Sequence, residues 1–140
     1  MLAPYAWRVR LAGWVGRQVL ARTSSIRPRI RAALPYLFPD LPETEIARIC
    51  ARVPENMART AVEIVSGADF YTHAASSPVA GPGWDALQEA RRTGRPAVLV
   101  TAHFGNAAAV GAALKARGFV IGTFFKPMPD PAVNRFYTAA

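Results

Sequence analysis

A short apolar run followed by three chemically distinctive residues limits the fold of this chain more than any other feature. Residues 96–101 read Pro-Ala-Val-Leu-Val-Thr, and His103, Gly105 and Asn106 follow at once. Six apolar or β-favouring residues in a row indicate a buried strand. Such a strand would carry an imidazole at its carboxyl end, the usual ligand position in an α/β sheet. We therefore predict a strand here and take its end as the candidate site.

The sequence after this run supplies the other parts of a parallel βαβ unit. Residues 106–117 are rich in alanine and are followed by Gly118, which predicts a helix and its end. Residues 119–125 form a second strand-like run, and a right-handed helical crossover makes the two strands parallel. The predicted fold class is α/β, with N-terminal helices followed by this βαβ unit. Since two parallel strands do not stand alone, we expect the front half of an incomplete α/β domain.

Helices are predicted for much of the remaining chain. Apolar residues dominate positions 2–21, and a helix with apolar spacings of three and four begins at Glu43 and ends before Gly67. Pro54 interrupts that helix, so we expect a kink or a junction of two helices near it. The other predictions are a basic connector at 23–33, a rigid proline-rich turn at 34–42, a loop at 68–83, and short helices at 84–92 and 131–137.

The positive charge is concentrated at the N-terminus. The formal net charge is +8, and seven arginines precede the first acid, Asp40. Beyond residue 31, ten basic and nine acidic residues nearly balance. Such a basic arm suits an anionic membrane surface, a nucleic acid or an acidic protein. Trp7 and Trp14 lie in an apolar helix, which favours a membrane interface over a polar nucleic-acid groove.

The N-terminal helix does not look like a free-standing membrane span. Arginines interrupt its apolar run, so it has no stretch of 18 uncharged apolar residues and no continuous core of a cleavable signal. The alternative to membrane association is a helix packed on its own domain with arginine stems lying along it. We predict a membrane-associated helix at 1–25 and the α/β part at 26–140.

His103 is the candidate catalytic group. A neutral imidazole can take a proton from a hydroxyl, and the N–H groups after Gly105 and Asn106 can hold an anion or oxyanion. A histidine base normally needs a carboxylate to orient it, yet no Asp or Glu lies between Glu89 and Asp130. From the residues alone, a structural histidine that caps a helix remains the alternative.

Signatures of cofactors and metals are missing from the sequence. Cys50 is the single cysteine, so neither a disulfide framework nor a cysteine metal site is predicted. No glycine-rich nucleotide-binding fingerprint occurs. We expect no cofactor and no metal. His73 and Glu63 are interpreted as ordinary surface groups.

The stretch GRPAVLVTAHFGN at 94–106 resembles the core motif of the lipid A late acyltransferase family, the lauroyl and myristoyl transferases of the lysophospholipid acyltransferase-like group. Members of that family typically read TAHFGNWE there. Further stretches resemble family motifs in the same order: 10–22 the N-terminal membrane helix, YLFPDL at 36–41, RTAVE at 59–63 and FKPMPDP at 125–131. The resemblance extends over the whole chain.

The resemblance implies an O-acyltransferase that moves a fatty acyl chain from acyl carrier protein to a hydroxyl of a lipid A precursor. It implies a location at the cytoplasmic face of the bacterial inner membrane, with anionic lipid as a further partner and no nucleic acid. His103 matches the histidine of the family's HxxxxD/E pair and is implied as the general base. Gly105, Asn106 and Lys126 are the expected substrate-binding residues.

The chain departs from the family pattern at three positions. Ala108 stands where the acid of the pair is expected, Ala107 replaces the tryptophan, and Pro35 stands where an asparagine is expected. Losing the acid costs on the order of 10⁴-fold in analogous triads. We expect a truncated and impaired enzyme that lacks the later half of the family fold, so Ala108→Glu alone should not restore activity. The alternative is a non-catalytic remnant that binds membrane or lipid.

Overall fold

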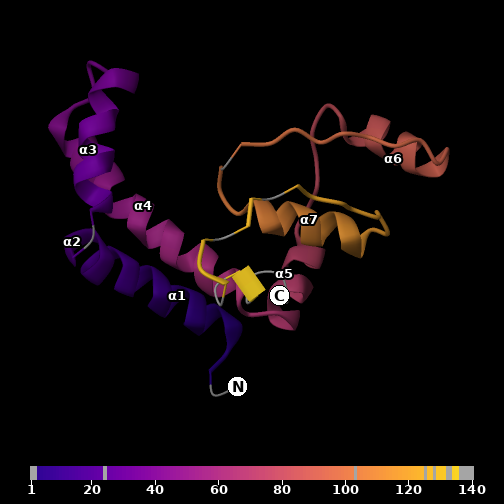
Figure 1. The fold of residues 1–140 in the computed structure, drawn as a ribbon, viewed down its shortest axis with the longest axis horizontal. Helices are drawn as coiled ribbons and strands as arrows, with labels where there is room; N and C mark the ends of the chain where they lie inside the picture. The colour runs from indigo at the N-terminus through magenta and orange to yellow at the C-terminus, as the bar shows by residue number, and fades with distance from the viewer. Residues whose placement is uncertain are drawn as a thin grey trace. The chain divides into compact units, whose positions relative to one another are not determined.

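The computed structural model describes residues 3–23, 25–102, 104–124, 126–127, 129–131 and 134–135 (Figure 1). Within these ranges every regular element is helical, and the chain forms two compact units, residues 1–66 and 67–140. The first unit contains α1 (Tyr5–Val15), the π-helical turn η1 (Gly16–Leu20), α2 (Ala21–Thr23), α3 (Ile26–Leu37) and α4 (Glu43–Ile64). The second contains α5 (Ala68–Ser76), α6 (Trp84–Arg92) and α7 (Ala107–Ala116).

In the first unit, the segment from α1 to α3 runs antiparallel to α4 (Figure 1). At one end, Arg8 Nη1 donates a hydrogen bond of 3.1 Å to Ser66 Oγ. At the other end, Arg31 Nη2 lies 2.6 Å from Glu43 Oε1. These two contacts fix the antiparallel arrangement. Helix α4 contacts every other helical element of the unit.

Two glycines allow α1 and η1 to approach α4 closely. A methyl group added at Gly16 would collide with the Pro54 carbonyl oxygen and would lie 2.7 Å from the Ala58 Cβ. A methyl group at Gly13 would collide with the Arg59 side chain. Atoms in contact need about 3.5–4.0 Å between carbons, so a larger residue does not fit at either position without displacement.

Three large apolar side chains of α1 are exposed. Trp7, Leu11 and Trp14, which we call the outer face of α1, are 67%, 59% and 59% exposed. The packed face includes Gly13 and the hydrogen-bonded Arg8. A surface helix of a globular protein ordinarily keeps its apolar stripe toward the core, whereas the apolar residues of α1 are spread around the helix. The close approach at Gly13 and the Arg8 hydrogen bond therefore contribute to the packing of α1 on α4.

In the second unit, α5 and α7 pack together and form the core (Figure 1). The buried apolar residues of these two helices are Phe70, Ala74, Ala112, Ala113 and Leu114. Arg117, just after α7, joins this core to the end of α5, because its Nη2 donates a 2.7 Å hydrogen bond to the Ser77 carbonyl oxygen. The small side chains of α7 let the two helices approach closely.

Helix α6 contacts the turn that follows α7. Gly118 has a φ of 80°, a left-handed conformation that glycine adopts without a steric penalty. Its carbonyl oxygen accepts a 3.2 Å hydrogen bond from Arg91 Nε, and the same guanidinium lies 5.3 Å from the centroid of the Phe119 ring. The ring of Trp84 lies 6.0 Å from that of Phe119. These contacts hold the turn after α7 against α6.

The predicted βαβ unit with parallel strands is wrong for the described residues. Residues 96–102 and 119–124 have no strand pairing, whereas the predicted crossover helix is present as α7. Val98, Val100 and Val120 are 90%, 92% and 103% exposed. The residues of these two segments favour an extended, buried backbone. A strand also needs a neighbouring strand that pairs with its N–H and C=O groups. The described part of the chain is therefore helical, not α/β.

Several smaller expectations can also be compared with the structure. Residues 68–76 form α5 instead of a loop, α3 extends over most of the expected connector with Pro35 inside it, and α4 is a single helix through Pro54. The helix at 84–92 is confirmed as α6, and the helical region at 2–21 is confirmed where it is described. The helix at 131–137 falls largely outside the described residues. The boundary at residue 25 stays a prediction.

Gly16→Ala is expected to destabilise the first unit by about 1–3 kcal/mol, because the added methyl group overpacks the contact with α4. Gly111→Ala is the matched control, since nothing lies within 4 Å of a Cβ added there. In the interior of α7 that change should stabilise by about 0.5–1 kcal/mol. Urea unfolding followed by circular dichroism measures both. Equal effects of the two substitutions would contradict the close approach at Gly16.

Candidate functional site

The Gly-Asn pair of the motif begins α7. Gly105 has a φ of 63°, which places it in the left-handed region that favours glycine. Asn106 is the N-cap residue, and its Oδ1 accepts a 3.1 Å hydrogen bond from the backbone N–H of Ala108. This bond satisfies one of the N–H groups that the first turn of a helix leaves unpaired. The two residues thus form the turn and the cap of the helix.

Of the other two predicted site residues, the structure describes only Lys126. His103 lies outside the described residues, so its role as general base stays a prediction. Its neighbour Phe104 is 91% exposed. Lys126 is exposed and lies in a separate segment after residue 124. The structure thus brings Gly105 and Asn106 together at the start of α7 and describes Lys126 only as a surface cation.

The position expected to hold the catalytic acid belongs to the first turn of α7. Ala107 and Ala108 are the first two residues of the helix, and both are exposed. The first turn of α7 has no acidic residue. A helix N-terminus favours a negative charge, so the backbone could support a carboxylate at this place. The side chain present is a methyl group, which can neither orient an imidazole nor stabilise its charged form.

A buried carboxylate in the first unit was missed by sequence reasoning. The side chain of Glu55 is 7% exposed and lies 2.6 Å from Arg59, 3.4 Å from Arg52 and 3.7 Å from Arg17. Because it pairs with Arg17 of η1 and with two arginines of α4, this carboxylate links η1 to α4. The signal in the sequence was the helical spacing of Arg52, Glu55 and Arg59, which places all three on neighbouring turns.

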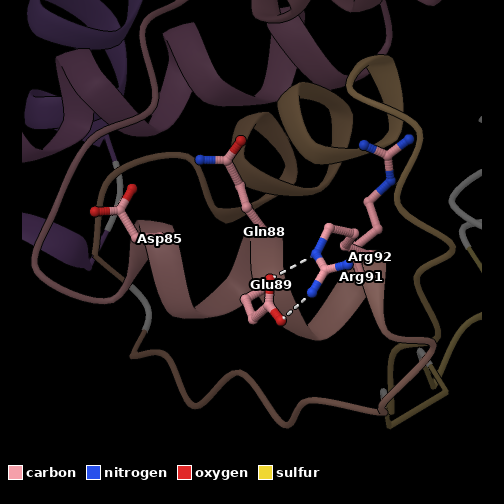
Figure 2. A pocket seen from close by; sticks show the side chains of 5 residues that line it. All are labelled: Asp85, Gln88, Glu89, Arg91 and Arg92. Atoms are coloured by element: carbon pink, nitrogen blue, oxygen red, sulfur yellow. Dashed lines mark hydrogen bonds and ion pairs between the residues drawn. The ribbon is translucent and has the colours of Figure 1, made fainter.

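A shallow hollow of about 540 Å³ lies beside α6 (Figure 2). Its lining residues are Asp85, Gln88, Glu89, Arg91 and Arg92. Arg92 donates two hydrogen bonds to the Glu89 carboxylate, of 2.6 and 2.8 Å, and these lower the pKa of Glu89 below its ordinary value of 4.5. The lining belongs to one exposed helix on which Glu89 and Arg92 pair with each other, so we interpret it as a solvated helix face.

No group of three or more His, Cys, Asp or Glu side chains among the described residues could hold a metal ion. In the same part of the chain, no helix combines the length and the apolar character needed to cross a bilayer.

The chain matches a known protein family over its entire length. Residues 1–140 match the family described as bacterial lipid A biosynthesis acyltransferase. The chain belongs to this family, which confirms the resemblance seen in its motifs. The family is one of acyltransferases of lipid A biosynthesis, so an acyl donor and a lipid A acceptor follow in general terms. No curated protein and no solved structure matched the chain.

Asn106→Ala is expected to destabilise α7 by about 1 kcal/mol, because the N–H of Ala108 loses its cap. Asn106→Asp keeps an acceptor oxygen at the same place and should cost much less. Amide hydrogen exchange in the first turn of α7 would resolve the two outcomes. If both variants lost protection equally, the capping bond would not be what stabilises this turn.

Proposed function

We propose that this chain is an acyltransferase that moves a fatty acyl chain from acyl carrier protein to a hydroxyl of a lipid A precursor. The observation that carries the proposal is the family match over residues 1–140, together with the uninterrupted TAHFGN segment at 101–106. We place the reaction at the cytoplasmic face of the bacterial inner membrane. The basic N-terminal arm supports an acidic carrier protein and an anionic membrane as partners.

In the proposed reaction His103 acts as the general base. The acceptor hydroxyl transfers its proton to the imidazole while its oxygen attacks the thioester carbonyl of the donor. The carbon–sulfur bond then breaks, an ester forms, and the thiol of the carrier leaves with the proton that the imidazole held. Backbone N–H groups near the start of α7 are the proposed donors to the oxyanion. The N–H of Ala108 already donates to Asn106 Oδ1, so it would have to be released for this role.

The exposed methyl group of Ala108 limits this chemistry. Without a carboxylate partner the imidazole lacks both an oriented tautomer and support for its positive charge. In analogous triads that loss slows catalysis on the order of 10⁴-fold. We therefore propose that the chain is an impaired transferase.

The outer face of α1 supports contact with a membrane. Its three large apolar side chains are more than half exposed, and Arg10 on the same helix is exposed as well. A helix that presents tryptophan and leucine to its surroundings beside arginine fits shallow insertion at the level of lipid headgroups. Anionic lipid adds about 1 kcal/mol of attraction for each arginine near the surface.

A second candidate function is a non-catalytic membrane- or lipid-binding remnant. The observation that favours it is the pair of exposed alanines, Ala107 and Ala108, at the expected acid position. This candidate keeps the membrane-binding first unit and dispenses with the reaction.

Acyl transfer from acyl carrier protein separates the two candidates. The native chain should show slow transfer that His103→Ala abolishes, because the base is lost. His73→Ala is the matched control, since His73 is an exposed residue of α5 and should leave the rate unchanged. Fast transfer by the native chain would contradict the proposed impairment. Transfer at the blank rate by all three forms, with membrane binding retained, would establish the remnant instead.

Trp7→Ala/Trp14→Ala is expected to weaken binding to vesicles that contain phosphatidylglycerol by tenfold or more. Burying a large apolar side chain contributes about 1.5–3 kcal/mol, and about 1.4 kcal/mol corresponds to tenfold in affinity. The control is Tyr36→Ala/Leu37→Ala, which removes two apolar side chains that are 89% and 68% exposed elsewhere in the first unit. Vesicle co-sedimentation measures all three proteins. Equal losses in both double variants would rule out a specific role for the outer face of α1.

A further inference from the structure

A hollow lined by arginines lies where α2 is followed by α3. Its volume is about 410 Å³, and its lining residues are Ala21, Arg22, Arg27, Pro28 and Arg31. Three of these five residues are cationic and none is acidic. Like charges that share a cavity repel one another, and an anion that enters relieves the repulsion.

The neighbouring groups do not neutralise this charge. Arg31 pairs with Glu43 at 2.6 Å, in an ion pair whose two side chains are 50% and 66% exposed. Arg22 Nη1 donates to the carbonyl oxygen and to the side-chain Oε1 of Gln18, at 2.5 and 2.7 Å. The oxygens of Gln18 orient the guanidinium without cancelling its charge. These contacts thus supply one carboxylate for three guanidiniums, and a net positive charge remains at the hollow.

The chemistry of the hollow fits a phosphate group. Ala21 is 5% exposed and Pro28 has no polar side-chain atom, so the lining is apolar between the arginines. A guanidinium presents its N–H groups as a planar fork that matches two phosphate oxygens, and a site with several such forks favours phosphate over a spherical anion.

The place of the hollow along the chain adds a second argument. Val19 and Leu20 of η1 are 45% and 36% exposed and directly precede Ala21 and Arg22. They follow the outer face of α1 along the same helical segment. Exposed apolar side chains beside a group of arginines suit a lipid surface, where the apolar groups enter the acyl region and the cations meet phosphates.

We propose that Arg22, Arg27 and Arg31 form a binding site for a phosphate group, carried either by a lipid headgroup or by free phosphate. The lipid source rests on the proposed membrane function, whereas the site itself does not. A duplex nucleic acid also carries phosphates, but the exposed apolar residues that lead to the hollow favour lipid.

The first test is a titration of the full chain with inorganic phosphate at constant ionic strength. The NMR chemical shifts of the backbone amides report the binding. Saturable shifts are expected at Ala21, Arg22, Arg27 and Arg31. In Arg22→Gln/Arg27→Gln the affinity should fall tenfold or more. Arg31 is left intact because it also pairs with Glu43.

The matched control is Arg29→Gln/Arg95→Gln, which removes the same charge from two exposed arginines that do not line the hollow. Its phosphate affinity should stay within twofold of the native value. Unchanged amide dispersion in both double variants checks that they are folded. Equal affinities of the two double variants for phosphate would overturn the proposal.

The second test compares vesicles of phosphatidylcholine with vesicles that also contain phosphatidic acid. If a lipid supplies the phosphate, Arg22→Gln/Arg27→Gln loses the preference for phosphatidic acid and the control variant keeps it. If free phosphate is the ligand, the NMR shifts occur but the preference is the same in all forms. Tighter binding to duplex DNA than to either vesicle would overturn the proposal.

The two tests distinguish failure of the proposed phosphate site from failure of the proposed membrane association. The Trp7→Ala/Trp14→Ala variant should still bind inorganic phosphate, because neither tryptophan lines the hollow. Vesicle binding by the native chain without amide shifts in phosphate, and without a preference for phosphatidic acid, would overturn the phosphate site alone. Phosphate binding without any vesicle binding would refute the membrane location and leave the site in place.

Discussion

The first unit depends on the close contact between η1 and α4 at Gly16. There is no space at this point for a side chain larger than hydrogen, because the Pro54 carbonyl oxygen and the Ala58 Cβ lie against the glycine. On the same turn of α4, next to Pro54, the buried Glu55 carboxylate pairs with Arg17 of η1 and with Arg59 of α4. Burying that charge is tolerable because it is paired, and removing a partner would leave it uncompensated. Steric fit and charge pairing therefore hold the two helices together.

This packing determines which side chains remain on the surface. Gly13 and the hydrogen-bonded Arg8 lie against α4, while Trp7, Leu11 and Trp14 are exposed. The arginine-lined hollow comes directly after η1, at α2 and α3. An apolar face and a group of cations thus follow one another along one helical segment. Both features of this surface therefore belong to the segment that packs on α4.

The sequence was most informative where a pattern depends on local chemistry. Helix α7 was predictable because its alanines have a high helix propensity and Asn106 caps its start. Both effects are local and need few distant partners. The motifs identified the family for the same reason, since they are read residue by residue. Strands at 96–101 and 119–125 could not be settled in this way, because Val98 and Val100 do not specify a pairing partner. Glu55 was overlooked because its burial and its ion pair with Arg17, which is distant in sequence, arise only in the folded chain.

The exposed segment at 96–101 has a consequence for how the protein behaves at high concentration. Val98 and Val100 project into solvent at 90% and 92% exposure, and the described backbone around them has no strand partner. Such a segment is a template for edge-to-edge association with the same segment of another molecule. Pro96 cannot donate to a ladder, and Arg95 adds a repelling charge, so both act as gatekeepers at the start of the run. Self-association of this chain would therefore begin within the motif that identifies its family.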